Sequence, residues 1–171
     1  MFDTLRTKPH RLALMLAGLA ALTLAGAFVF QFGFGIEPCA LCYQQRYAYY
    51  AALPLALVLA GLAAREETPG LWLVILFALC ALGFVANAAL GVYHAGVEWH
   101  WWPGPVTCAS GATGLDGEQG SLWDAIGAAR VVRCDEAAWR FLGLSLAGYN
   151  VLISLGLATI AAWGAALCWR K

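Results

Sequence analysis

Two cysteines separated by two residues, Cys39 and Cys42, are the first groups in this sequence that can do chemistry. A Cys-x-x-Cys pair can be a redox pair, half of a zinc site or a static disulfide. A disulfide across two intervening residues closes a very small loop, so it removes little chain entropy and is easily reduced. A purely structural role is therefore weakly supported, and a redox pair is the best physical match.

Two further cysteines, Cys108 and Cys134, are separated by 25 residues. They lack the Cys-x-x-Cys or His-x3–5-His spacing that usually completes a four-ligand zinc site, and no histidine pair lies nearby, so we predict no metal site. Alone, this pair can be a structural staple for a loop. If both cysteine pairs lie on the same side of the membrane, the two pairs can instead exchange disulfides with each other by thiol–disulfide exchange. Spacing alone leaves both interpretations open.

Polar groups accompany the Cys-x-x-Cys pair. Arg46 follows Cys42 at i+4, which places it on the same helical face one turn further on. A guanidinium there can stabilise a thiolate or a partly reduced acceptor, although an arginine reaching for the membrane interface fits the spacing equally well. His94 follows an apolar stretch, about 71–93, that is the third of four in the chain. At this position it can hydrogen-bond a carbonyl ligand or simply be an interfacial polar residue.

The segments that must position these groups are strongly apolar. Hydrophobic residues make up 62% of the 171 residues and charged residues only 12%, whereas a soluble domain carries about 25% charged residues. Four stretches are apolar on all sides and long enough to cross a hydrocarbon core of roughly 30 Å: about 12–34, 43–64, 71–93 and 144–167. The first is longer than the apolar part of a cleaved signal peptide, so we expect a true span. The sequence therefore predicts a single all-α domain, residues 1–171, folded as a polytopic four-helix transmembrane bundle.

Basic residues predict how the bundle is oriented. Six of the ten lysines and arginines lie before the first stretch, between the second and third, or after the fourth, all on one side of the bilayer. The connections 35–42 and 95–141 lie on the other side, and the longer one carries three arginines against six acids. The positive-inside rule then places both termini in the cytoplasm and all four loop cysteines on an oxidising face. The net charge of zero gives no indication of a nucleic-acid partner.

The long connection is predicted to contain a short amphipathic helix lying on the outer membrane surface. Ser121 and Asp124 form a capping signal. The apolar residues behind it fall on one helical face: Leu122, Trp123, Ile126 and Ala129. The two remaining cysteines of the chain, Cys80 and Cys168, lie within apolar stretches and are expected to be small buried hydrophobic residues.

The run Pro38-Cys39-Ala40-Leu41-Cys42-Tyr43-Gln44-Gln45-Arg46 resembles the Pro-Cys-x-x-Cys-x-x-x-Arg signature of the DsbB family of disulfide-bond formation proteins. Four spans, cytoplasmic termini and a long second outward loop with one further cysteine pair agree with that family. Tyr93-His94 and Phe141-Leu142-Gly143-Leu144 also resemble it, so the similarity covers essentially the whole chain. Gln45 stands where some members carry an acid, so an acid there is not needed for the core chemistry.

The resemblance implies a quinone-dependent protein-disulfide oxidoreductase of the bacterial inner membrane. A reduced, periplasmic DsbA-like protein would attack the Cys108–Cys134 disulfide at Cys108, and the freed Cys134 would exchange with Cys39. Such a DsbA–DsbB–quinone system is the known means by which the bacterial periplasm is kept oxidising.

The resemblance also implies a cofactor, ubiquinone or menaquinone from the membrane pool. Cys42 would be the thiolate facing the quinone, and Arg46 and His94 would hold it. Two alternatives remain at this stage: a protein of the same fold dedicated to one exported client, and a structural membrane protein whose outer loops are stapled by two inert disulfides.

Overall fold

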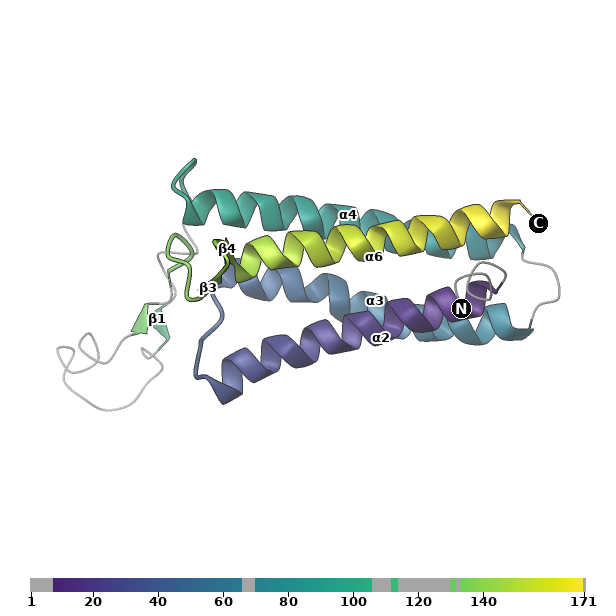
Figure 1. Cartoon of the computed structure of the whole chain (residues 1–171), viewed down its shortest axis with the longest axis horizontal. Coiled ribbons are helices and arrows are strands. Elements are labelled where there is room, and N and C mark those ends of the chain that lie inside the picture. Colours follow the sequence, from purple (N-terminus) through teal and green to yellow (C-terminus); the bar gives the residue numbers. More distant parts are fainter. Residues whose placement is uncertain (1–7, 66–69, 106–111, 114–129, 132, 171) are drawn as a thin grey trace.

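The structure, a computed structural model, describes residues 8–65, 70–105, 112–113, 130–131 and 133–170. Four long helices run side by side as an elongated bundle (Figure 1). In chain order the elements are α2 (Pro9–Phe28), η1 (Val29–Gly33), α3 (Ala40–Arg65), α4 (Leu71–Glu98), β1 (Ala112–Thr113), β2 (Arg130–Val131), β3 (Arg140–Phe141), β4 (Leu144–Ser145) and α6 (Leu146–Trp169).

Among the described residues, four helices are long and apolar enough to cross a membrane, with mean hydropathies of 1.7 to 2.5. This confirms the predicted all-α, four-helix transmembrane fold and makes the chain a multi-pass membrane protein. The strands add only two antiparallel ribbons, β1 with β2 and β3 with β4. The predicted surface helix at 121–129 lies outside the described residues.

The outer surface of the bundle differs from that of a water-soluble bundle. Large apolar side chains such as Leu22 and Leu82 are more than half exposed, because the solvent around the helices is lipid. Alanines fill much of the interior instead, and small side chains let helix backbones approach closely. The most completely buried are Ala13, Ala20, Ala56 and Ala161.

A buried polar cluster connects three of the helices. Tyr49 of α3 donates from its hydroxyl to Asn150 Oδ1 of α6 at 2.5 Å. Asn87 of α4 donates from Nδ2 to Ser154 Oγ of α6 at 2.9 Å. Hydrogen bonds between membrane helices contribute about 0.6 kcal/mol each, so the cluster fixes the register of α3, α4 and α6 more than it adds stability.

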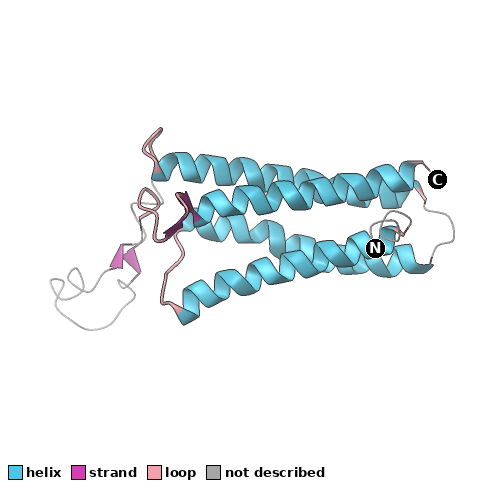
Figure 2. Ribbon diagram, in the orientation of Figure 1, coloured by secondary structure: helices cyan, strands magenta, loops and turns pink. Residues whose placement is uncertain are grey.

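Most of the described loops and strands gather at one end of the bundle, which also carries Cys39 and Cys42 and is called here the thiol end (Figure 2). The start of α2 and the end of α6 lie at the opposite end (Figure 1). Towards the thiol end α2 diverges from its neighbours and finishes in the π-helical turn η1. Single π-helical turns are frequent at functional sites, because the extra residue reorients the side chains around it.

A close contact between α4 and α6 depends on a glycine, and this gives a first testable prediction. A Cβ on Gly164 would overlap the ring of Phe77, which is fully buried and has no space to move into. We expect Gly164→Ala to destabilise the protein by about 1–3 kcal/mol, as overpacking does, and to lower the Tm measured in detergent. The control is Gly83→Ala, because a Cβ there meets no atom within 4 Å. Equal losses of Tm in both variants would contradict this packing.

Candidate redox site

Cys39 and Cys42 lie where α3 begins. Cys39 immediately precedes the helix and accepts a hydrogen bond at its Sγ from the backbone N–H of Cys42, at 3.3 Å. One helical turn returns the chain to the same side, so the two sulfurs lie 2.8 Å apart. Both residues are free thiols. The Cys-x-x-Cys spacing and the helix start together bring the two sulfurs within reach of one bond.

The surroundings of Cys39 favour its thiolate. Its side chain is only 5% exposed, and hydrogen bonding from the Cys42 thiol holds the pKa of Cys39 well below the usual range of a cysteine. The His94 ring and the backbone N–H of Cys42 lower this pKa further, while burial opposes the shift. A thiolate is the nucleophile in thiol–disulfide exchange, so Cys39 is prepared for that reaction.

The structure brings Cys134 to the same place, although 94 residues separate it from Cys39 in the sequence. Cys134 packs in one buried cluster with Cys39, Leu41 and Val97. It is disulfide-bonded, in contrast to the four other cysteines among the described residues. The remaining predicted site cysteine, Cys108, lies outside the described residues.

His94 comes from α4, which continues past the predicted end of the span to Glu98. The histidine is 3% exposed, so it is buried within the bundle. Its Nε2 lies 3.5 Å from Cys39 Sγ, and its Nδ1 lies 2.8 Å from Nε2 of Gln45. The amide of Gln45 therefore holds the ring with Nε2 towards the thiols.

Glu98 is a member of the site that sequence reasoning counted only among the acids of the long connection. Its Oε1 lies 3.8 Å from His94 Nε2, one helical turn away on α4. The side chain is 6% exposed, and its Oε2 has no hydrogen-bond partner. The i,i+4 spacing of His94 and Glu98 was the available signal, because it places both side chains on one helical face.

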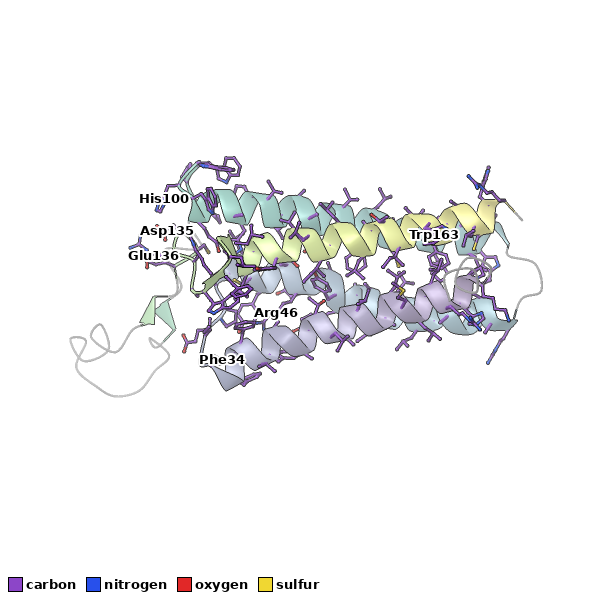
Figure 3. The ribbon with its side chains drawn as sticks, viewed as in Figure 1. Phe34, Arg46, His100, Asp135, Glu136 and Trp163 are labelled. Atoms are coloured by element: carbon purple, nitrogen blue, oxygen red, sulfur yellow. The ribbon has the colours of Figure 1, made fainter. Side chains whose placement is uncertain are left out.

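Arg46 is buried within the bundle. Its guanidinium donates to Gln31 Oε1 of η1 at 2.6 Å and to the carbonyl oxygen of Ala27 at 3.3 Å. It also lies over the rings of Phe28 and Tyr43, 5.5 and 5.4 Å from their centroids. Figure 3 shows Arg46 inside the bundle between α2 and α3. No ion pair among the described residues includes it, so the cation is held by neutral groups and aromatic faces.

A cavity of about 760 Å³ joins these groups. Cys39, Cys42, Arg46, His94 and Glu98 all line it near the thiol end. Its remaining wall is mostly apolar and comes largely from α2 and α6, with Leu22, Phe30, Ile153, Leu157 and Ile160 among the lining residues. An apolar cavity of this size with a few converging polar groups is typical of a site for a small organic molecule.

Charged residues mark the surface near this site. Arg133 forms a bidentate pair with Asp135, at 2.6 and 2.9 Å, and contacts Glu136 at 3.5 Å. Figure 3 shows Asp135 and Glu136 at the thiol end, whereas Trp163 lies towards the opposite end. The segment that carries Cys134 therefore presents an exposed polar surface directly above the buried thiols.

Comparison with known proteins identifies the family of this chain. The family model described as "Disulfide bond formation protein DsbB" matches residues 9–164. A relative from Acidovorax sp. (strain JS42), named "Disulfide bond formation protein B", is 30% identical over 167 residues, covering 94% of this chain and 89% of the relative. A protein of the same name from Verminephrobacter eiseniae (strain EF01-2) is 33% identical over 162 residues, covering 91% and 86%.

A third relative of that name, from Nitrosococcus oceani, is 33% identical over 150 residues and covers 85% of this chain and 84% of its own. No solved structure matches the chain. The matched region contains all four membrane helices except the last residues of α6, together with all six cysteines but Cys168. The chain belongs to the DsbB family and is a multi-pass membrane oxidoreductase of disulfide bond formation.

Proposed function

We propose that the protein reoxidises a periplasmic, DsbA-like thiol oxidase and passes the electrons through its two cysteine pairs to a quinone of the bacterial inner membrane. The observation that carries this proposal is the cavity of about 760 Å³, which is apolar along α2 and α6 and is also lined by Cys42 and Arg46. Ubiquinone and menaquinone combine an apolar body with carbonyl oxygens, and both features have a counterpart in this cavity. The distribution of basic residues supports cytoplasmic termini and a periplasmic thiol end.

The first half of the reaction is thiol–disulfide exchange. A thiolate of the reduced partner attacks Cys108, a mixed disulfide forms, and Cys134 leaves as a thiolate. Cys134 then attacks Cys39 of an oxidised Cys39–Cys42 pair, and Cys42 leaves as a thiolate. The second thiol of the partner attacks its own mixed disulfide and frees Cys108, so the partner leaves oxidised. Cys108 then attacks Cys134, which restores the Cys108–Cys134 disulfide and releases Cys39, so that Cys39 and Cys42 are both reduced. The shared buried cluster of Cys134 and Cys39 supports this order, because the exchange needs those two sulfurs to meet.

The second half takes place in the cavity. A bound quinone supplies an acceptor for two electrons and two protons. Arg46 would hold an oxygen of the quinone, since its guanidinium is fixed by Gln31 and Ala27 and has no acidic partner among the described residues. Cys42 is the less buried of the two thiols and lines the same cavity, so its sulfur would face the ring. His94 lies beside Cys39 and would stabilise its thiolate until the disulfide re-forms.

The test is an anaerobic assay of the purified protein in detergent with a short-chain quinone, followed by the loss of quinone absorbance. Cys134→Ser is expected to leave the DsbA-like partner reduced while a small dithiol still drives quinone reduction through Cys39 and Cys42. The control is Cys80→Ala, because Cys80 is a buried thiol of α4 outside the cavity lining. Partner oxidation at an unchanged rate in Cys134→Ser would remove Cys134 from the relay.

A further inference from the structure

The thiol pair has a second capacity besides electron transfer. We propose that the reduced Cys39–Cys42 pair, together with His94 and Glu98, is a binding site for a thiophilic divalent cation, Zn²⁺ above all. We further propose that an ion bound there holds the pair reduced and stops turnover. Binding itself is independent of the function proposed above, and only its inhibitory consequence rests on that function.

The geometry of three ligand atoms is already close to that of a metal centre. The sulfurs of Cys39 and Cys42 and a ring nitrogen of His94 all lie within 4.8 Å of one another. Ligands of a tetrahedral zinc ion, bound at about 2.0–2.3 Å, stand roughly 3.5–3.8 Å apart. His94 Nε2 is 3.5 Å from Cys39 Sγ, which matches, while the 2.8 Å between the sulfurs must widen by about 1 Å. Cys42 borders the cavity and is not fully buried, so its side chain has room to move.

Glu98 is an independent indication of a missing cation. Its side chain is 94% buried and lines the same cavity, yet its Oε2 has no hydrogen-bond partner. A buried carboxylate oxygen without a partner is costly, and such groups are usually satisfied by a donor, a water or an ion. Glu98 Oε1 is 3.8 Å from His94 Nε2, so the carboxylate lies on the side of the ring that faces the sulfurs. Glu98 is not among the three ligand atoms that lie within 4.8 Å of one another, so its side chain must turn towards the sulfurs to become the fourth ligand.

Two further residues, Gln45 and Arg140, are placed to orient a ligand of the metal and to balance its charge. Metal-binding histidines usually have their second ring nitrogen fixed by a hydrogen bond, as Gln45 fixes Nδ1 of His94 at 2.8 Å. The glutamine amide can turn its oxygen towards Nδ1 when that nitrogen carries the proton. Two thiolates, one carboxylate and a divalent ion leave one negative charge, and Arg140 stands close by, with Nη2 3.5 Å from the Glu98 carbonyl oxygen.

The chemistry makes this site dependent on redox state. Binding replaces the protons of two thiols by one metal ion and transfers no electrons. The disulfide form has no thiolates to offer, so only the reduced pair binds. Thiolate and imidazole ligands favour Zn²⁺ and its soft relatives over Mg²⁺ or Ca²⁺. Sequence spacing argued against zinc because no second ligand pair follows in the chain, whereas the fold supplies two ligands from α4.

The binding test uses the full-length protein in detergent, reduced without oxygen, freed of reductant and kept free of quinone. Titration with Co²⁺, whose thiolate charge-transfer absorption reports sulfur ligation, is expected to reach one equivalent per chain and to be reversed by Zn²⁺. We expect His94→Ala and Glu98→Gln each to weaken binding by about 10-fold or more, and the oxidised protein to bind none. Cys80→Ala is the matched control and should bind normally.

Absence of the sulfur-to-metal band in the reduced protein would overturn the metal site, as would equal binding by the oxidised protein or by His94→Ala. The inhibitory step is tested by adding Zn²⁺ to the prereduced protein before quinone, which should stop quinone reduction until a chelator is added. Full turnover with one Zn²⁺ bound per chain would overturn the inhibition. Metal binding by a protein that never reduces quinone would instead overturn the function proposed above and leave the metal site intact.

Discussion

Cys42→Ser is expected to abolish quinone reduction by the prereduced protein, lowering the rate on the order of a thousandfold or more. The proposed reaction ends with a bond between two sulfurs that lie 2.8 Å apart, and a serine oxygen cannot form that bond. Cys42 also lines the apolar cavity beside Arg46, where the quinone is proposed to bind. The measurement is anaerobic quinone bleaching with a small dithiol as the electron donor, so that the outcome does not depend on a docking partner.

The matched control for this variant is Cys80→Ala. Cys80 is also a buried free thiol, but it lies 14 residues before His94 on α4, about 20 Å along the helix. Its loss should leave the rate within about twofold, as expected for a small change in a packed core. A Cys42→Ser protein that retains a tenth of the parental rate would remove Cys42 from the electron path.

The four-helix fold could be predicted because helices that cross a membrane have a simple sequence pattern. A segment surrounded by hydrocarbon needs no polar stripe, so a run of more than 20 apolar residues is sufficient evidence of a span. The end of α4 was harder to predict, because His94 was expected to close the span and Glu98 was expected in the long connection that follows it. In the structure α4 continues to Glu98, and both side chains are buried at the thiol end, near Val97, which packs in one cluster with Cys134.

The residues of the site that lie close together on one helix could be predicted from the sequence. Cys39, Cys42 and Arg46 follow one another at helical spacing at the start of α3, and a local pattern is enough to identify them. Contacts between elements have no such signature. The pairing of Gln45 with His94 joins residues 49 positions apart, and the pairing of Gln31 with Arg46 depends on the π-helical turn that ends α2. Both require the packed bundle.

The second large effect is expected at Arg46. Arg46→Ala should raise the KM for a short-chain quinone by about 10–100-fold, because a hydrogen bond from a charged donor contributes about 1.5–3 kcal/mol. Thiol–disulfide exchange should slow far less, because the guanidinium donates to Gln31 and Ala27 and not to a sulfur. The two effects are separated by measuring KM for quinone and, in a quinone-free mixture, the rate at which the oxidised protein accepts electrons from the dithiol.

Two further variants show whether the effect belongs to this guanidinium. Arg46→Lys keeps the charge but cannot present the planar fork that reaches both Gln31 and Ala27, so its KM should lie between those of the parent and Arg46→Ala. Arg65→Gln removes an exposed arginine at the opposite end of the same helix and should leave KM unchanged. If Arg46→Ala slows thiol exchange as much as it raises KM, the arginine supports the thiols rather than the quinone, and the cavity must hold its ligand through other residues.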